Sequence, residues 1–294
     1  LIRRMRSLRK TFRFIGIASS LHSGADTDGT VDSIRDNVKL RGANIWMLVC
    51  SAVLASIGLD VDSTAVIIGA MLISPLMSPI LGVGLGVAIS DSELLRSSLR
   101  NLSAAVLLSL VTSFLYFELS PLGQLTSELS ARTTPTLLDV AVAFFGGVAG
   151  IVAGSRSNKT TAIPGVAIAT ALMPPICTAG FGLATANLPV FLGASYLFFI
   201  NAVFIGLATY AVSRVLKLPK VGEPDSESRV RMRWTVLALV LLTLAPSVVI
   251  FWDVVVRTRF NNGVKNFVNN EVRREDVQPV RWDVAFQQSE RVLK

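Results

Sequence analysis

The sequence has few residues that carry catalytic or metal chemistry. Its 294 residues include one histidine, His22, and two cysteines, Cys50 and Cys177, both within apolar runs. Such cysteines behave as small hydrophobic residues, and no C-x-x-C spacing occurs, so a metal site with nitrogen and sulfur ligands is not expected. The sequence also has no nucleophile–base arrangement and no glycine-rich phosphate loop. We therefore expect no enzyme, no catalytic residue, no metal, no cofactor and no ATP-driven pump.

Charged residues are also scarce, at 16% of the chain against about 25% in soluble domains. Apart from Asp139, near the start of the fourth, they are missing from seven apolar runs of the length that crosses a bilayer as a helix. The net charge of +8 does not indicate nucleic-acid binding, because the basic residues lie between apolar runs rather than in a patch with aromatic residues. The sequence predicts an all-α polytopic membrane protein with about seven transmembrane helices. The runs are 44–59, 64–89, 102–117, 137–154, 161–186, 190–212 and 234–252.

The distribution of lysine and arginine predicts how these helices are oriented. With a cytoplasmic N-terminus, the cytoplasmic segments up to the seventh run hold 19 basic residues, and the outer loops hold one, Arg132. Cytoplasmic loops carry the excess of positive charge in membrane proteins. We therefore expect a multi-pass protein of the cell inner (cytoplasmic) membrane, with its N-terminus inside and its C-terminus outside. The acidic residues expected in the outer loops are Asp60, Asp62, Glu118 and Glu128.

Two of the apolar runs are similar to each other. Residues 69–88, GAMLISPLMSPILGVGLGVA, and residues 165–184, GVAIATALMPPICTAGFGLA, align without gaps at an offset of 96 positions. Over positions 58–88 the alignment gives 11 identities, and a shared Leu-Met-x-Pro-Ile core is the most specific part. Chance similarity between two helices rich in glycine, alanine and leucine is the alternative. The shared core favours an internal duplication.

The offset between the two similar segments covers three membrane crossings. Three is odd, so the second copy is expected to run in the opposite direction. The sequence thus predicts a 3+3 inverted repeat with two proline-broken helices, as in secondary transporters. Three domains are expected: a cytoplasmic basic amphipathic segment (1–43), a transmembrane domain (44–252) and the start of an extracytoplasmic α/β segment (253–294). Within the transmembrane domain, the repeats are expected at about 44–117 and 137–212, followed by an extra helix at 234–252.

The two proline-containing breaks are the candidate binding site. A proline inside a helix removes one backbone hydrogen bond, and lipid offers no water to replace it. Main-chain groups at the breaks are then available to a solute or ion. A purely structural kink, in which neighbouring helices satisfy these groups, is the alternative. The candidate substrate- or ion-binding residues are Ser74, Pro75, Ser78, Pro79, Thr170, Pro174, Pro175 and Thr178.

Few other polar residues are expected at membrane depth. Asp139, near the start of the fourth run, is interpreted as a helix-end residue rather than a proton-coupling group, and Asp91 and Asn187 are interpreted in the same way. The absence of other carboxylates from the runs counts against a proton-driven pump. Asn201 in the sixth run is expected to form an interhelical hydrogen bond. Thr30, in the N-terminal segment, is expected to cap a short helix.

Three segments of the chain carry a resemblance to a known family: GANIWMLVCSAVLASIGL, DSTAVIIGAMLISPLMSPILGVGLG and PGVAIATALMPPICTAGFGLA. Across roughly residues 41–217, the chain resembles the bacterial and archaeal integral membrane protein family known as domain of unknown function 389. The resemblance implies a polytopic inner-membrane protein. It implies no established substrate and no catalytic residue.

Together these patterns favour a secondary transporter or channel-like conductor of a small solute or ion, with its site at the paired broken helices. The alternative is a non-transporting membrane scaffold or sensor whose flanking segments bind partners. The expected partners are the lipid bilayer and an unknown small solute or ion, with no nucleic acid. Glycine-rich helix faces also favour a homo-oligomer.

Overall fold

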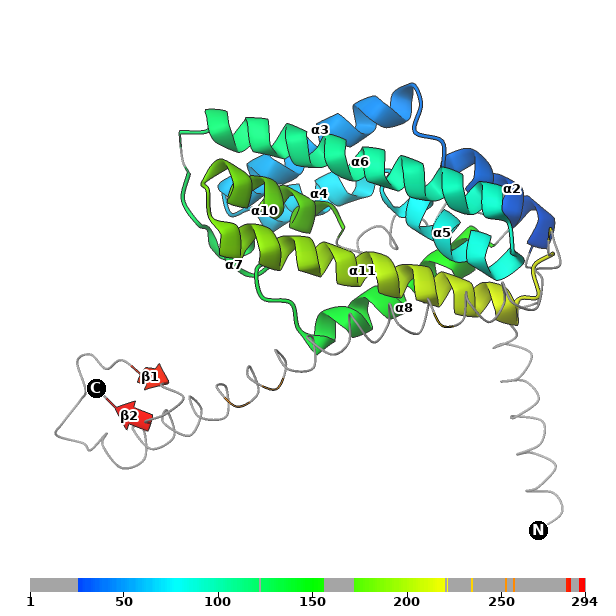
Figure 1. Cartoon of the computed structure of the whole chain (residues 1–294). Coiled ribbons are helices and arrows are strands. Elements are labelled where there is room, and N and C mark those ends of the chain that lie inside the picture. Colours follow the sequence, from blue (N-terminus) through cyan, green and yellow to red (C-terminus); the bar gives the residue numbers. More distant parts are fainter. Residues whose placement is uncertain are drawn as a thin grey trace, which may run out of the picture.

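The part of the chain that can be described is a bundle of helices (Figure 1). The two strands in this part, β1 (Val284–Phe286) and β2 (Arg291–Leu293), pair with each other in an antiparallel hairpin. The computed structural model describes residues 26–121, 123–155, 172–219 and 221, together with 234, 252, 256, 284–286 and 291–293.

Several of the helices can cross a membrane, which identifies a membrane protein. The bent pair α4 (Thr64–Ile73) and α5 (Met77–Ile89), with an angle of 52° between the two helices, makes a fifth candidate span. The predicted seventh helix, 234–252, lies outside the described residues except for its two end tryptophans. Four single helices are long and apolar enough: α3 (Ala43–Asp60), α6 (Ser92–Leu119), α8 (Leu137–Gly154) and α11 (Leu188–Val215).

The helix α6 begins about ten residues before the predicted run. Arg96 and Arg100 lie in this added part. Charged residues are good helix formers but are costly in lipid, so hydropathy marks where a helix enters the membrane rather than where it begins. A shorter helix, α2 (Thr27–Asn37), precedes the bundle, and Asp26 caps it by accepting from the Gly29 N–H at 2.9 Å. The prediction that Thr30 is the cap was wrong, because the helix begins at Thr27 and the Asp26 carboxylate caps it through the Gly29 N–H.

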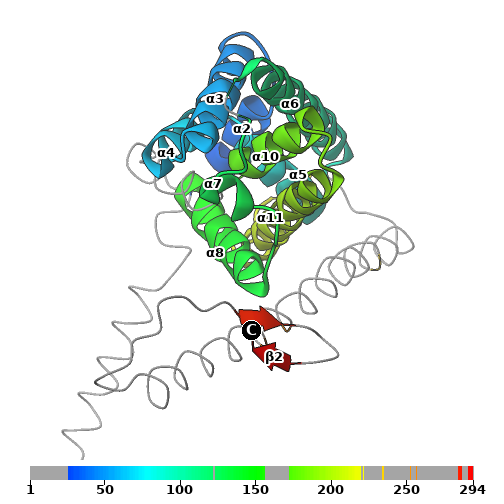
Figure 2. The same cartoon turned by 90° about the vertical axis from the view of Figure 1, so that its left-hand side faces the viewer.

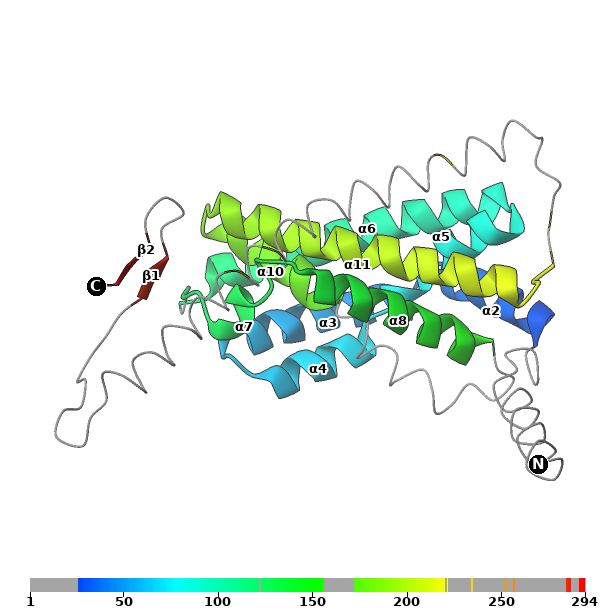
Figure 3. The same ribbon diagram turned by 90° about the horizontal axis from the view of Figure 1, so that it is seen from below.

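The short helix α10 (Met173–Ala184) lies near the centre of the bundle, with α3, α6 and α11 around it (Figure 2). The core is formed where these helices meet α4, and Leu48, Leu59, Ile67, Met173 and Ile200 are fully buried there. The very short helix α7 (Ser127–Ser130) lies at the end of the bundle opposite α2 (Figure 3). The two ends of the bundle are therefore built from different segments.

The long helices α6 and α11 have the same length and the same type of N-terminal cap. Each contains 28 residues, and their first residues lie 96 positions apart. The Asp91 carboxylate accepts from the Leu94 N–H at 2.9 Å, and the Asn187 side-chain oxygen accepts from the Val190 N–H at 3.3 Å. The helix-end role expected of Asp91 and Asn187 is therefore confirmed. In Figure 1, α6 runs from right to left and α11 runs from left to right.

The turns that precede these two caps also correspond. Ser90 and Ala186 both have a left-handed backbone, with φ of 61° and 49°. The next backbone N–H in each turn donates to the carbonyl of Gly86 or Gly182, at 2.9 and 2.7 Å respectively. This pattern satisfies carbonyls at the ends of α5 and α10. Each short helix thus turns back against the long helix that follows it.

The helix α5 packs against α11, and α10 packs against α6, each at a glycine. A Cβ atom on Gly84 would lie 2.7 Å from the Cβ of Thr209, and a Cβ atom on Gly180 would lie 2.7 Å from the Cβ of Ser113. Positions 84 and 180, and positions 113 and 209, again differ by 96. These two contacts bring the helix backbones closer than any side chain would allow.

Candidate functional site

A cavity of about 300 Å³ lies at the α7 end of the bundle. Its wall combines apolar residues with charged and polar ones, and we call it the polar cavity. Five helices or the turns next to them contribute to its wall, so residues far apart in the sequence meet there. Pro175 belongs to the first turn of α10, and the cavity therefore reaches the point where this central helix begins. The lining residues are Thr64, Glu128, Ala131, Arg132, Asp139, Val142, Ala143, Pro175, Leu197 and Asn201.

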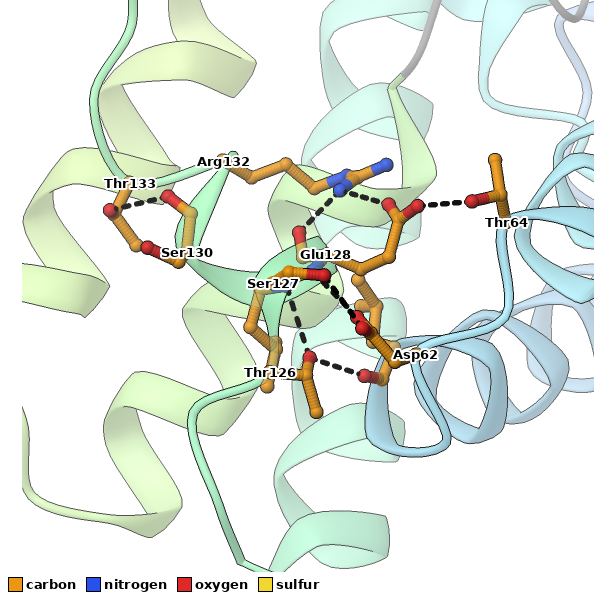
Figure 4. Close-up of polar contacts among 10 residues, drawn as sticks. Asp62, Thr64, Thr126, Ser127, Glu128, Ser130, Arg132 and Thr133 are labelled. Atoms are coloured by element: carbon orange, nitrogen blue, oxygen red, sulfur yellow. Dashed lines mark hydrogen bonds and ion pairs between the residues drawn. The ribbon is translucent and has the colours of Figure 1, made fainter. Parts of the chain in front are cut away.

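An ion pair supplies most of the charge in this wall. Arg132 Nη1 lies 2.6 Å from Glu128 Oε2, and both side chains are largely buried, at 16% and 17% exposure. The same Nη1 also donates to the main-chain carbonyl of Glu128, and the Thr64 hydroxyl donates to Glu128 Oε1 (Figure 4). The ion pair thus connects α7 with the first residue of α4.

The turn between α3 and α4 fixes α7 in place (Figure 4). The Asp62 carboxylate accepts from the Ser127 hydroxyl at 2.6 Å and from the Glu128 N–H at 2.8 Å. These two hydrogen bonds, the Ser127 one first, lower the pKa of Asp62 from its ordinary value, because they stabilise the charged form. The Thr126 hydroxyl donates to the carbonyl of Leu59 at 2.7 Å. One wall of the cavity is therefore held by side-chain contacts rather than by a long helix.

Asp139 lines the cavity and also has a structural role. Its Oδ2 accepts from the N–H of Thr136 at 2.7 Å and from the Thr136 hydroxyl at 2.8 Å. These contacts close the N-terminus of α8 as in a capping box. The expected helix-end role of Asp139 is confirmed, and the cavity additionally places its carboxylate beside a polar space.

The prolines at the two breaks stand in a different place from the one expected. Pro79 lies in the first turn of α5, and Pro174 and Pro175 lie in the first turn of α10. The first N–H groups of a helix have no partner within the helix, and proline is favoured there for that reason. The predicted break in the first segment is confirmed, since α4 and α5 are separate helices at 52° to each other. Pro79, Pro174 and Pro175 lie at helix starts rather than within a helix interior. They instead remove donors that would otherwise be unpaired.

The eight candidate site residues differ in their described surroundings. Pro175 is the one that lines the polar cavity, and Thr170 lies outside the described residues. The Ser74 hydroxyl accepts from the Leu76 N–H at 3.4 Å within the α4–α5 break. Thr178 is fully buried, and its hydroxyl has no hydrogen-bond partner in the part of the chain that the structure describes. Of the remaining residues, Pro75 and Ser78 are half-buried, and Pro79 and Pro174 are buried.

Asp60 was expected in an outer loop, but it is the last residue of α3 and is 5% exposed. Its Oδ2 accepts from the hydroxyls of Ser120 at 2.6 Å and Tyr116 at 3.1 Å, while its Oδ1 has no partner among the described residues. The expectation that Asp139 is the only carboxylate within the spans was therefore wrong. Hydropathy placed the end of the run before this charged residue, although the hydroxyls of Tyr116 in α6 and of Ser120, the cap of α6, compensate for its burial.

One feature of the sequence outside the motifs points to the residues of the cavity. Arg132 is the single basic residue in the predicted outer loops, against 19 on the other side. An isolated exception to that charge distribution indicates a specific contact. Glu128, four residues earlier, is at the spacing at which opposite charges pair on a helix. These two residues form the ion pair of the cavity.

Comparison with known proteins agrees with the sequence resemblance. Residues 71–207 match the model of the family described as Domain of unknown function (DUF389). The chain contains a DUF389 domain. The chain is 26% identical over 218 residues to "Uncharacterized protein MJ0678" of Methanocaldococcus jannaschii, covering 74% of this chain and 68% of that protein. No solved structure matches the chain. The DUF389 match includes α7 and all cavity residues except Thr64.

Proposed function

We propose that this DUF389 protein is a secondary transporter or channel-like conductor of a small solute or ion. The observation that carries the proposal is the polar cavity of about 300 Å³, which ends at the first turn of a central, buried helix. Glu128 and Arg132 lie on α7 and the turn after it, at one end of the bundle, where a solute that enters from that side would meet them. The cavity has a paired cation and anion in its wall, and its size fits a small molecule.

The proposed architecture is a 3+3 inverted repeat with a seventh helix at 234–252. The corresponding caps, turns and glycine contacts at the 96-position spacing support it. So do the directions of the helices: α3 and α8, with 18 residues each, run in opposite directions, as α6 and α11 do (Figure 1). In transporters of this type, the substrate site lies between the two repeats, which move against each other.

The proposed orientation follows from the charges at the two ends of the bundle. Arg96, Arg100 and Arg214 belong to the end that carries α2, whereas Asp62 and Glu128 belong to the end that carries α7. By the positive-inside rule, the α2 end faces the cytoplasm of a cell with this protein in its inner membrane. The polar cavity then opens to the outside.

The contacts of Arg132 support a polar or anionic solute group as the ligand of the cavity. Arginine has five N–H donors, and the hydrogen bonds of Arg132 to described residues come from Nη1 alone. The Nε and Nη2 donors have no partner among these residues. They are suited to a carboxylate, phosphate or carbonyl oxygen, which arginine binds in a planar, two-pronged geometry.

A flux assay tests this function. The purified full chain is reconstituted in liposomes, and stopped-flow light scattering follows osmotic swelling in glycine, acetate, chloride, urea and glycerol. We expect at least one of these solutes to enter faster than in empty liposomes. Arg132→Gln should lower that rate about tenfold, as expected for the loss of a contact of about 1.4 kcal/mol, and Arg132→Lys should lower it less.

The control variant is Lys39→Gln, which removes an exposed charge at the opposite end of the bundle. Its rate should equal that of the unchanged chain. Circular dichroism verifies that each variant keeps its helices. If none of the five solutes enters faster than in empty liposomes, the alternative function, a non-transporting membrane scaffold or sensor, is favoured instead.

A further inference from the structure

A second hollow, of about 260 Å³, lies between α5, α6 and α11 and is almost entirely apolar. Figure 1 shows α5 between the right-hand ends of α6 and α11. Leu99 and Phe199 line the hollow and are 48% and 40% exposed, so it opens to the side of the bundle. We call it the side groove. It differs from the polar cavity in both its position and its chemistry.

The length of the side groove matches one leaflet of a bilayer. Its lining on α11 extends from Phe198 to Tyr210, which is about 18 Å at 1.5 Å per helical residue. Half of a hydrocarbon core of about 30 Å is about 15 Å. The groove therefore has the length of an acyl chain in the leaflet on the α2 side.

The Tyr210 end of the side groove leads to basic residues. Arg214 follows Tyr210 by four residues on the same face of α11, and Arg96 precedes Leu99 by three residues on α6. Lys217 lies two residues after the end of α11, and all three basic side chains are exposed. Within the described ranges, none of them pairs with an acidic side chain. The groove is thus apolar along its length and positively charged at one end.

We propose that the side groove binds an anionic phospholipid, with one acyl chain in the groove and the phosphate at Arg214, Lys217 and Arg96. Basic sites between transmembrane helices on the cytoplasmic side are suited to such headgroups. A second copy of this chain in parallel orientation is a poorer occupant, because it would bring the same positive end against this one. The site does not depend on transport, but its assignment to the cytoplasmic leaflet rests on the proposed orientation.

Gly206 offers a way to fill the side groove without disturbing the bundle. It lines the groove, and a Cβ atom at this position would meet no atom within 4 Å. The hollow therefore exists partly because this residue has no side chain. Gly206→Leu should occupy the space meant for the acyl chain, while Gly206→Ala should fill little of it.

Native mass spectrometry of the purified full chain in detergent tests the proposal, with phosphatidylglycerol and phosphatidylcholine of identical acyl chains as probes. We expect phosphatidylglycerol to bind more tightly. Arg214→Gln should weaken its binding about fivefold, as expected for one basic residue at a membrane surface, and should leave phosphatidylcholine binding unchanged. Gly206→Leu should lower the binding of both lipids. Arg41→Gln, an exposed basic residue away from the groove, is the matched control and should change neither.

Two results would overturn the proposal. The first is equal binding of both lipids that Arg214→Gln does not change. The second is a dimer of the unchanged chain that Gly206→Leu converts to a monomer without altering lipid binding, which would assign the groove to a second copy. Should Gly206→Leu fail to fold, the surface variant Arg214→Gln decides alone. Because the readout is a bound mass, a negative flux assay does not affect this test.

Discussion

The matched glycine contacts of α5 and α10 give the sharpest test of the architecture. In Gly84→Ala and Gly180→Ala, the new Cβ atom would lie 2.7 Å from the Cβ of Thr209 or Ser113, and in Gly84→Ala it would also lie 2.4 Å from the carbonyl oxygen of Gly206. Ordinary carbon–carbon contacts are about 3.5–4.0 Å, so each variant must separate two packed helices by about 1 Å. Overpacking of this kind costs about 1–3 kcal/mol. Alanine regains about 0.5–1 kcal/mol through its higher helix propensity, which leaves a net loss of about 1–2 kcal/mol.

Thermal unfolding in detergent, followed by circular dichroism, measures this loss. The expected change is a midpoint roughly 2–8 °C lower in each variant. Gly69→Ala is the matched control, because Gly69 lies inside α4 and a Cβ there would meet no atom within 4 Å. This control should raise the midpoint slightly, since only the gain in helix propensity remains.

The two variants also test whether the contacts are equivalent. If α5 and α10 are the same helix in two copies of a repeat, Gly84→Ala and Gly180→Ala should lower the midpoint by similar amounts. Midpoints at or above that of Gly69→Ala in both variants would refute the close packing itself. A large loss in one variant and none in the other would refute the equivalence.

Two further predictions concern the α7 end of the bundle and the topology. The hydrogen bonds from Ser127 and Glu128 lower the pKa of Asp62 from its ordinary value of 3.8. The stabilisation of α7 by the Asp62 carboxylate should therefore be complete above pH 3.8 and lost as the pH falls below it. Hydrogen exchange of the α7 amides should therefore speed up below pH 3.8 in the unchanged chain, whereas Asp62→Asn should show no such step from this carboxylate. In a chain whose two native cysteines are replaced by alanine, Ser63→Cys and Ser157→Cys should react with a membrane-impermeant maleimide from opposite sides. Labelling from the same side would contradict the inversion.

The spans could be predicted from the sequence because their signal is local. An apolar run without charge must be a helix in lipid, and the run at 137–154 coincides with α8. The ends of the helices were harder to predict. The N-terminal part of α6, with Arg96 and Arg100, is helical outside the apolar run, and Asp60 ends α3 inside the bundle because hydroxyls of α6 bind it.

The polar cavity could not be predicted from motifs, because its residues come from distant segments. Thr64, Glu128 and Asn201 meet only once the helices have packed. The break at 74–76 was predicted correctly, since α4 and α5 are separate helices at 52° to each other. The site was nevertheless placed on the main chain of the breaks, whereas the charged side chains near the cavity lie on α7, the turn after it and the start of α8.

Because the charged groups lie near α7 rather than on the main chain of the breaks, the expected place of selectivity on the proposed route also changes. Main-chain N–H groups at the start of a helix favour anions, but Pro174 and Pro175 remove two of the first four such donors of α10. On the proposed route, a solute in the cavity would therefore meet Pro175 in the wall rather than a row of free N–H groups. The charges it meets are those of Arg132 and Glu128 in the side wall. On the proposed route, selection by charge is then expected at α7 and the turn that follows it rather than at the first turn of α10.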